Sequence, residues 1–258
     1  MKSLFLCLYP NCNFEYNMVS LYWAKEVQAV NIPPASSEYM YQVLKNEILT
    51  LEIKPGEPMS ENDLCKRFGV SRTPVRSALQ RLRDAGLVTI VPYKGTTASL
   101  LNFEEIRQLI YMRVAVESMV LRDFIDRYTP TDLERVRYVI RKQTVLLQGE
   151  HTSEQFYDLD SQLHAIWFTA IGMDRLWRAI QKAQTNYTRF RMLDIVAVQQ
   201  FGDILAEHEK LFGILERHAK DEVEPFVRRH LNGGIERLGA RLENELADYF
   251  ISSDHSHT

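Results

Sequence analysis

The chain has 258 residues, of which 45% are hydrophobic and 25% charged, and its formal net charge at neutral pH is −3. This composition is that of a soluble globular protein of one or two domains. No apolar run reaches the ~18 residues of a membrane span, and three cysteines form no even disulfide framework, so we expect a cytoplasmic protein with reduced thiols.

Residues 1–36 show no clear periodicity and end in NIPPASS, whose two adjacent prolines mark a linker. The apolar start of the chain is short and lacks a small-residue cleavage site, which argues against a signal peptide. We expect a poorly ordered N-terminal extension, or translation that begins at Met18.

Helical periodicity begins at Glu38 and is broken by the sequence KPGEPMS at 54–60. Ser60 is then placed to cap a second helix, SENDLCKRF, with an acidic residue at its third position. Gly69 follows this helix where a left-handed residue is favoured, so we expect the helix to end there.

A third helix is predicted between Ser71, in the capping position, and Gly86. It is followed by two short β segments within 87–100, around a turn at 93–95. The order helix, helix, tight turn, helix and β-hairpin predicts a winged helix-turn-helix, in which the third helix buries an apolar stripe formed by Val75, Leu79 and Leu82.

Positive charge is concentrated on this third helix and around it. Residues 66–94 carry seven Lys or Arg and one acidic residue, whereas residues 101–258 carry 20 basic and 25 acidic ones. Such asymmetry is typical of a polyanion-binding module joined to a second domain. A solvated basic helix face is the alternative, but the tight turn and the wing favour DNA binding.

Side chains at the start of the third helix are suited to the major groove. Arg72 and Arg76 lie four residues apart and share the face opposite the apolar stripe. A guanidinium can bond O6 and N7 of guanine together or clamp a phosphate, and short hydroxyls and a glycine turn suit the DNA backbone. We predict six DNA-binding residues: Ser71, Arg72, Thr73, Arg76, Lys94 and Gly95.

The segment 44–99, with its run GVSRTPVR-x-AL-x-RL-x-x-x-GL, closely resembles the DNA-binding domain of GntR-superfamily transcriptional regulators. The remaining residues resemble FCD, the all-helical effector domain of the FadR branch. The resemblance covers roughly 37–250 and implies a dimeric, ligand-responsive DNA-binding protein. Two positions depart from the family pattern: Asn62 replaces a residue that is basic in many relatives, and Ala98 stands at the usual valine position of the wing.

From Asn102 onward, helical periodicity is interrupted at regular intervals, and we expect six helices near 103–127, 131–148, 153–171, 174–193, 199–218 and 221–250. Six helices with short connections predict an antiparallel bundle, with seven as the alternative; among FCD proteins, six resembles the VanR-like group. The predicted fold class is mainly α. Its parts are the extension 1–36, the winged helix-turn-helix 37–100, the helical ligand-binding and dimerisation domain 101–250, and the tail 251–258.

Polar residues interrupt the apolar stripes of three bundle helices. Asp160 and His164 lie four apart and point the same way, while His208 and His230 each stand within a stripe. A single inward histidine is usually a core residue, but three with a carboxylate suit a divalent ion. The pattern also resembles the metal site of many FCD domains. We predict a site for Zn²⁺, with Ni²⁺ or Mn²⁺ as alternatives, formed by Asp160, His164, His208 and His230.

Arg113 and Glu117 interrupt the stripe of the first bundle helix. They can form an internal ion pair, or Arg113 can anchor the carboxylate of a small organic acid near the metal. FCD relatives often have an arginine at this place, so the resemblance implies an effector-binding role. Arg189 and Arg191 are weaker candidates for the same role.

These features predict a regulator, expected to be a repressor, that binds double-stranded operator DNA as a homodimer on a short inverted repeat. A metal-dependent bundle enzyme acting on a small organic acid is the alternative. However, the sequence offers no nucleophile arrangement and no phosphate-binding or dinucleotide motif. A structural nucleic-acid-binding protein without a ligand would leave the inward Asp160 and histidines unexplained.

Overall fold

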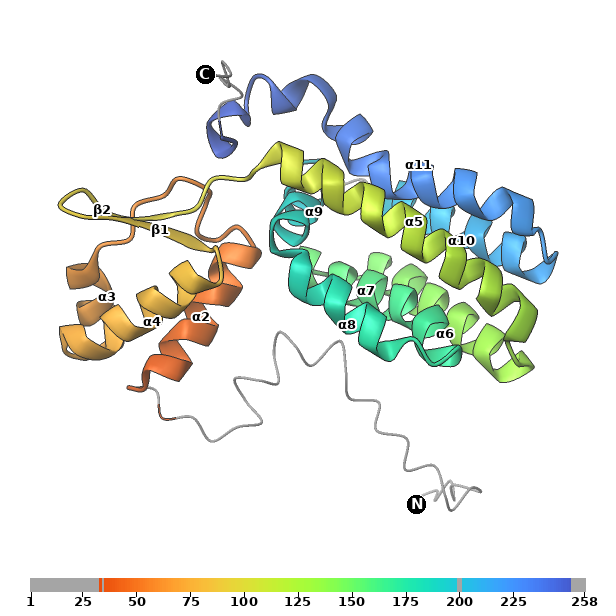
Figure 1. The fold of residues 1–258 in the computed structure, drawn as a ribbon, viewed down its shortest axis with the longest axis horizontal. Helices are drawn as coiled ribbons and strands as arrows, with labels where there is room; N and C mark the ends of the chain where they lie inside the picture. The colour runs from red at the N-terminus through yellow and green to blue at the C-terminus, as the bar shows by residue number, and fades with distance from the viewer. Residues whose placement is uncertain (1–32, 34, 199–200, 252–258) are drawn as a thin grey trace.

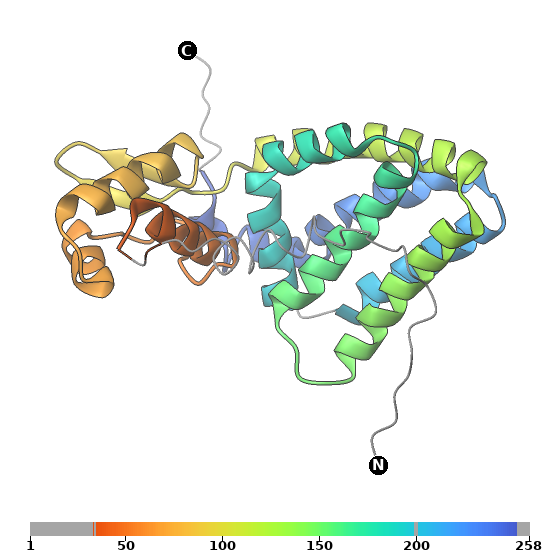
Figure 2. The ribbon, with the colours of Figure 1, turned by 90° about the horizontal axis from the view of Figure 1, so that it is seen from below.

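The computed structural model describes residues 33, 35–198 and 201–251. Almost all of the predicted extension and tail therefore lies outside the described residues. The described chain forms a small N-terminal unit beside a larger helical bundle (Figures 1 and 2). In these residues, no helix combines the length and the hydrophobicity that a membrane span requires.

The N-terminal unit follows the predicted order of a winged helix-turn-helix. Strands β1 and β2 pair antiparallel, with Val88 opposite Ala98, and form the wing. The hairpin turn contains two left-handed residues, Tyr93 and Gly95. The described elements of this unit are α2 (Ser37–Leu49), α3 (Glu61–Phe68), α4 (Arg72–Asp84), β1 (Val88–Val91) and β2 (Gly95–Ala98).

Local sequence explains where these helices begin and end. Ser60 accepts a hydrogen bond from the backbone N–H of Asp63 at 3.4 Å, which satisfies one free donor of α3. Gly69 ends α3 with a φ of 65°, a conformation that glycine adopts without steric cost. Ser71 occupies the N-cap of α4, but its side chain makes no capping hydrogen bond. The first turn of α4 therefore keeps free N–H groups at the surface.

The predicted stripe of α4 is buried. It packs on α2, and the six side chains at this contact are at most 1% exposed: Met40, Leu44, Ile48, Val75, Leu79 and Leu82. Since full burial of such a side chain contributes about 1.5–3 kcal/mol, this contact fixes α4 on the N-terminal unit.

The bundle contains seven α-helices among the described residues, which is the alternative count that the sequence left open, so the six-helix resemblance to the VanR-like group does not hold. The span predicted as one helix at 174–193 is two helices separated at Gln184, and Asp194 lies inside the second rather than between helices. The bundle helices are α5 (Phe103–Arg127), α6 (Pro130–Leu147), α7 (Ser153–Ala170), α8 (Asp174–Ala183), α9 (Thr185–Val198), α10 (Phe201–Glu216) and α11 (Lys220–Leu238).

Helix α11 ends earlier than predicted, because Gly239 takes a φ of 48° and two short 3₁₀ turns follow, at Gly239–Leu242 and Ala247–Tyr249. Helices α5 and α11 run side by side in both views (Figures 1 and 2), and α9 stands at the end of the bundle that faces the N-terminal unit. The bundle thus meets the N-terminal unit through α9 and the start of α5.

Residues 249–251 hold the junction between the two units. The backbone N–H of Leu101 donates to the carbonyl of Tyr249 at 2.8 Å, and the N–H of Ile251 donates to the carbonyl of Leu101 at 2.9 Å. Phe103 then packs edge-to-face on Phe190 of α9, with ring centroids 6.4 Å apart. The connection from the wing to α5 is therefore an ordered segment.

Candidate functional site

The six residues predicted to contact DNA lie at the start of α4 and at the tip of the wing, and all of them are exposed. The guanidinium of Arg72 donates to the amide oxygen of Asn62 at 3.0 Å. Arg76 forms an ion pair with Glu61, also at 3.0 Å. Both partners stand at the start of α3, so α3 orients the two arginines, and sequence periodicity along α4 alone could not reveal this contact.

Acidic neighbours reduce the positive charge of this surface. Arg81 pairs with Glu38 and Arg83 with its neighbour Asp84. Each of these exposed pairs contributes about 0–1 kcal/mol to stability, so the arginines can exchange them for contacts with DNA phosphates.

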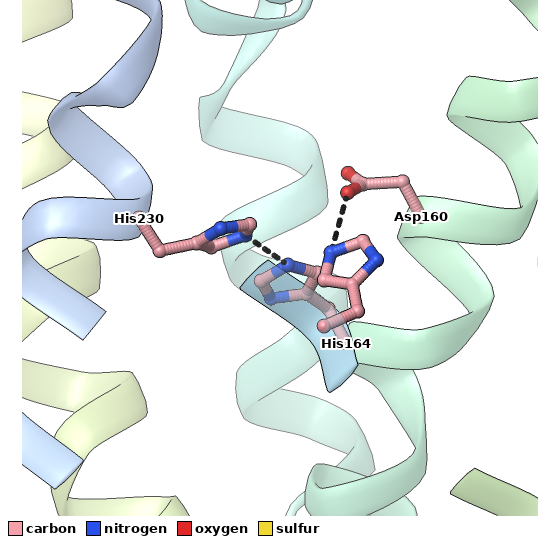
Figure 3. Close-up of side chains that lie close together, drawn as sticks. Asp160, His164 and His230 are labelled. Atoms are coloured by element: carbon pink, nitrogen blue, oxygen red, sulfur yellow. Dashed lines mark hydrogen bonds and ion pairs between the residues drawn. The ribbon is translucent and has the colours of Figure 1, made fainter. Parts of the chain in front are cut away.

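The predicted metal-binding residues converge in the bundle core. Asp160 and His164 come from α7, His208 from α10 and His230 from α11, and one ligand atom from each lies within 4.8 Å of all the others. None of these residues is more than 7% exposed. Figure 3 shows Asp160, His164 and His230 turned toward one another. The three helices thus bring together residues that are up to 70 positions apart in the sequence.

Each histidine is oriented from behind by a hydrogen bond at Nδ1. A carboxylate of Glu117 lies 2.6 Å from Nδ1 of His164, and that of Glu207 lies 2.6 Å from Nδ1 of His230. The side-chain oxygen of Gln143 lies 2.8 Å from Nδ1 of the remaining histidine, His208. Because oxygen acceptors hold all three Nδ1 protons, each neutral ring presents the lone pair of Nε2 to the centre.

The four atoms at the centre of the cluster lie close to one another, and two of them lack a hydrogen-bond partner. Nε2 of His164 faces Nε2 of His230 at 3.2 Å, and two lone pairs at this distance repel unless a cation or a proton lies between them. Nε2 of His208 is 3.3 Å from Oδ1 of Asp160, and neither atom has a hydrogen-bond partner. Three imidazole nitrogens and one carboxylate are ligands that fit a divalent ion such as Zn²⁺.

The protonation states suit such an ion. Burial lowers the pKa of His230 from its ordinary 6.5 to about 4, and burial also lowers the pKa of His208. Burial opposes ionisation of Asp160, but the charge of nearby Arg191 helps to hold the pKa of this carboxyl well below its ordinary value. At neutral pH the centre therefore offers the neutral imidazoles of His208 and His230 and the carboxylate of Asp160 without releasing protons from them.

Arg113 forms the internal ion pair that the sequence left open. Its Nε lies 2.6 Å from Glu117, both side chains are buried, and its guanidinium stacks over the ring of Tyr187 at 4.7 Å. Burial acts to raise the pKa of Glu117, but the charge of Arg113 lowers it to about 2. Arg113 is also 3.5 Å from Nδ1 of His164, so it lies directly behind the ligand cluster, the name used below for Asp160, His164, His208 and His230.

The two weaker effector candidates lie on different sides of α9. Arg191 faces the cluster, 3.6 Å from Asp160 and 3.0 Å from Asp194. Arg189 does not join them: its guanidinium donates to the backbone carbonyl of Ser99, at the end of the wing, at 2.6 Å. The structure therefore separates Arg189 from the cluster for which the sequence had proposed it.

Two sequence profiles match the chain: "Bacterial regulatory proteins, gntR family" over residues 36–97 and "FCD domain" over residues 108–233. The HTH-type transcriptional repressor RspR of Escherichia coli (strain K12) is 25% identical over 83% of this chain and 93% of its own. YdfH of E. coli O6:H1, an uncharacterized HTH-type transcriptional regulator, is 25% identical over 86% and 96%. The solved structure of E. coli McbR/YncC shares the fold, with a TM-score of 0.61 at 18% identity, over 83% of this chain and 99% of that one.

Proposed function

Because the chain belongs to the GntR family of bacterial transcriptional regulators, with a helical FCD domain after its DNA-binding unit, we propose that it is a repressor whose DNA binding responds to a divalent metal and a small carboxylate. The metal would be held by Asp160, His164, His208 and His230, the same four residues that the sequence predicts as ligands. Operator recognition would rest on the start of α4 and the wing.

A single observation carries the metal proposal: three buried histidines are each held at Nδ1 by an oxygen acceptor, and each presents Nε2 to one point. Histidines that served packing alone would need hydrogen-bond partners for their ring nitrogens, but they would not need to direct three Nε2 atoms to the same point. When bound, a divalent ion would supply a cross-link between α7, α10 and α11 and an open coordination position for a ligand oxygen. Zn²⁺ suits this mixture of nitrogen and oxygen ligands, and Ni²⁺ and Mn²⁺ are the alternatives.

The charges behind the cluster support a carboxylate as the effector. Arg113 and Arg191 are buried cations that flank the ligand side chains from α5 and α9. Each already pairs with a carboxylate, so an incoming anion would share these cations with Glu117 and Asp160. We expect an effector small enough to coordinate the metal through one carboxylate and to draw on Arg113 for its charge.

The protein would act as a homodimer on a short inverted repeat, because one recognition helix reads too few base pairs to select a site in a genome. A metal-dependent enzyme is not favoured. The relatives of this chain carry the names of transcriptional regulators, and the DNA-binding unit would have no task in an enzyme.

DNA fragments selected by the purified protein from genomic DNA test the regulatory part of the proposal. The expected result is enrichment of a few sites with inverted symmetry. Fragments without a shared motif would argue against specific DNA recognition.

Elemental analysis of tag-free protein tests the metal part. The tail carries two further histidines that can bind metal, so the measurement uses a background with His255→Ala and His257→Ala. We expect one bound ion per chain in this background and loss of that ion in the His208→Ala, His230→Ala variant. His151→Ala, a histidine outside the cluster, is the control and should keep the ion. Equal metal content in all three proteins would mean that the clustered histidines are core residues.

A further inference from the structure

Arg189 is a fully buried arginine that has no acidic partner in the part of the chain that the structure describes. Its side chain is 0% exposed, and its hydrogen bond is the one from Nη2 to the carbonyl of Ser99. Nε and Nη1 have no partner among the described residues, and burial lowers the pKa of the guanidinium to about 10. Taking such a charge out of water without a counter-ion costs several kcal/mol, so an apolar side chain would fill this position more favourably. The residue must therefore be explained by what its hydrogen bond does.

The partner of Arg189 connects to the recognition helix through two backbone hydrogen bonds. The N–H of Ser99 donates to the carbonyl of Leu87 at 2.9 Å, and the N–H of Leu87 donates to the carbonyl of Leu82, inside α4, at 2.9 Å. Ser99 also follows β2 directly, so it marks the base of the wing. A force on the carbonyl of Ser99 thus acts on both DNA-contacting elements.

The opposite side of α9 contacts the candidate metal centre. Residues two apart on a helix point about 200° apart, and Arg191 indeed reaches Asp160, at 3.6 Å, while Arg189 points toward the wing. Tyr187, which shares the side of Arg191, lies under the guanidinium of Arg113. Helix α9 therefore has one side on the ligand cluster and the other on the DNA-binding unit.

Helix α9 is also too closely packed to deform locally. A Cβ at Gly234 of α11 would lie 3.1 Å from the ring of Phe190 and 3.2 Å from the carboxylate of Asp194, so these α9 side chains pack directly on the α11 backbone, with little space left between them. A displacement at the cluster would move α9 as a rigid element, together with the guanidinium of Arg189.

We propose that Arg189 is the positioning residue through which the metal-binding bundle sets the orientation of the wing and the recognition helix. The inference rests on the proposed metal centre for its input, but not for the contact itself. If Asp160 moved toward the centre on holding an ion, Arg191 and α9 would follow it, and the bond from Arg189 to Ser99 would carry the shift to the base of the wing. The uncharged, unbranched side chain of Arg189→Met removes this bond while it fills the space of the aliphatic part of the arginine.

Amide hydrogen exchange measured by mass spectrometry, without DNA, tests the proposal. Three proteins are compared after chelation and after addition of one equivalent of Zn²⁺: the wild type, Arg189→Met, and Arg178→Met as a matched control on the exposed face of α8. In the wild type and the control, Zn²⁺ should slow exchange in peptides over 95–101 by about tenfold. In Arg189→Met the same peptides should exchange fast in both states, while peptides over 160–168 still respond to Zn²⁺.

The outcomes separate this inference from the proposed function. Failure of the wild type to bind Zn²⁺ would overturn the metal centre, and the chelated samples would still show whether Arg189→Met releases the segment 95–101. Equal exchange of that segment in wild type and Arg189→Met would overturn the positioning role. If the variant fails to fold, the wild type decides: a segment that exchanges equally with and without bound Zn²⁺ would refute the transmission through α9.

Discussion

The carboxylates of Glu117 and Glu207 each orient one histidine of the proposed metal site, His164 and His230 respectively. Substituting the two glutamates one at a time distinguishes their effect on metal affinity from their effect on the stability of the metal-free protein. Each lies 2.6 Å from Nδ1 of a histidine in the cluster. In Glu117→Gln and Glu207→Gln the amide oxygen can still accept the proton, but the negative charge that strengthens the ligand is lost. Loss of such a partner typically lowers metal affinity 10–100-fold, and we expect this for both variants.

The stability of the metal-free protein should distinguish the two variants. Glu117 is the only carboxylate that pairs with Arg113 among the described residues, and both are almost fully buried. Breaking a buried pair by removing one partner costs about 3–5 kcal/mol. Glu207 is 19% exposed, and its cationic neighbour Arg237 also pairs with Asp194 at 2.7 Å, so Arg237 retains a carboxylate partner when Glu207 is replaced. Glu207→Gln should therefore cost about 1 kcal/mol.

Urea unfolding in the presence of a chelator measures the free energy of unfolding, and competition with a chromophoric Zn²⁺ chelator measures affinity. Equal unfolding free energies for the two variants would show that Arg113 does not depend on Glu117. Unchanged Zn²⁺ affinity in both would show that the carboxylates do not act on a metal ligand.

Three further predictions address the DNA surface, the buried histidines and the packing of α9. Arg72→Ala should cost about 1–3 kcal/mol of binding to a selected duplex in gel shifts at fixed salt, whereas Lys94→Ala should weaken all duplexes alike and reduce the salt dependence; sequence-independent weakening by Arg72→Ala would contradict the recognition role. The folded state holds the pKa of His230 at about 4, below the ordinary 6.5, so the unfolded chain takes up the proton first as the pH falls. Metal-free protein should therefore lose up to about 3 kcal/mol between pH 6.5 and 4, and a flat profile in urea unfolding would disprove the burial of a neutral ring. Gly234→Ala places a Cβ 3.1 Å from an aromatic ring of α9 and should cost about 1–3 kcal/mol, whereas Gly213→Ala meets only the flexible end of an arginine and should stabilise α10 by about 0.5–1 kcal/mol; equal thermal shifts would contradict the close packing of α9.

The parts of the structure that local sequence determines were predictable. The caps and glycines around α3 and the apolar stripe of α4 carry the winged helix-turn-helix, because they act within a few residues. The ligand cluster was also accessible: Asp160 and His164 lie one helical turn apart, and a histidine within an apolar stripe must face the core. Their convergence from three helices then follows from the closure of the bundle.

The remaining features arise from contacts between elements. Nothing in the sequence marks Gln143 or Glu207 as a partner of a ligand, since each becomes one only when α6, α10 and α11 pack together. The break at Gln184 carries neither glycine nor proline, so the periodicity runs on and joins α8 to α9. Residues 187–195 of α9 are all buried, so this part of the helix shows no apolar stripe, and periodicity therefore could not assign Arg189 to the side away from the cluster.

The hydrogen bonds between Leu101 and the segment 249–251 have a consequence for how the protein is made. These residues are separated by more than half of the chain, so loop-closure entropy makes their pairing a late step in folding. During synthesis, the N-terminal unit leaves the ribosome and can fold well before Tyr249 and Ile251 have been translated. A nascent chain can therefore present its recognition helix to DNA before the hydrogen bonds between Leu101 and residues 249–251 have formed. In the proposed mechanism, binding that responds to the bundle would begin only when residues 249–251 have paired with Leu101.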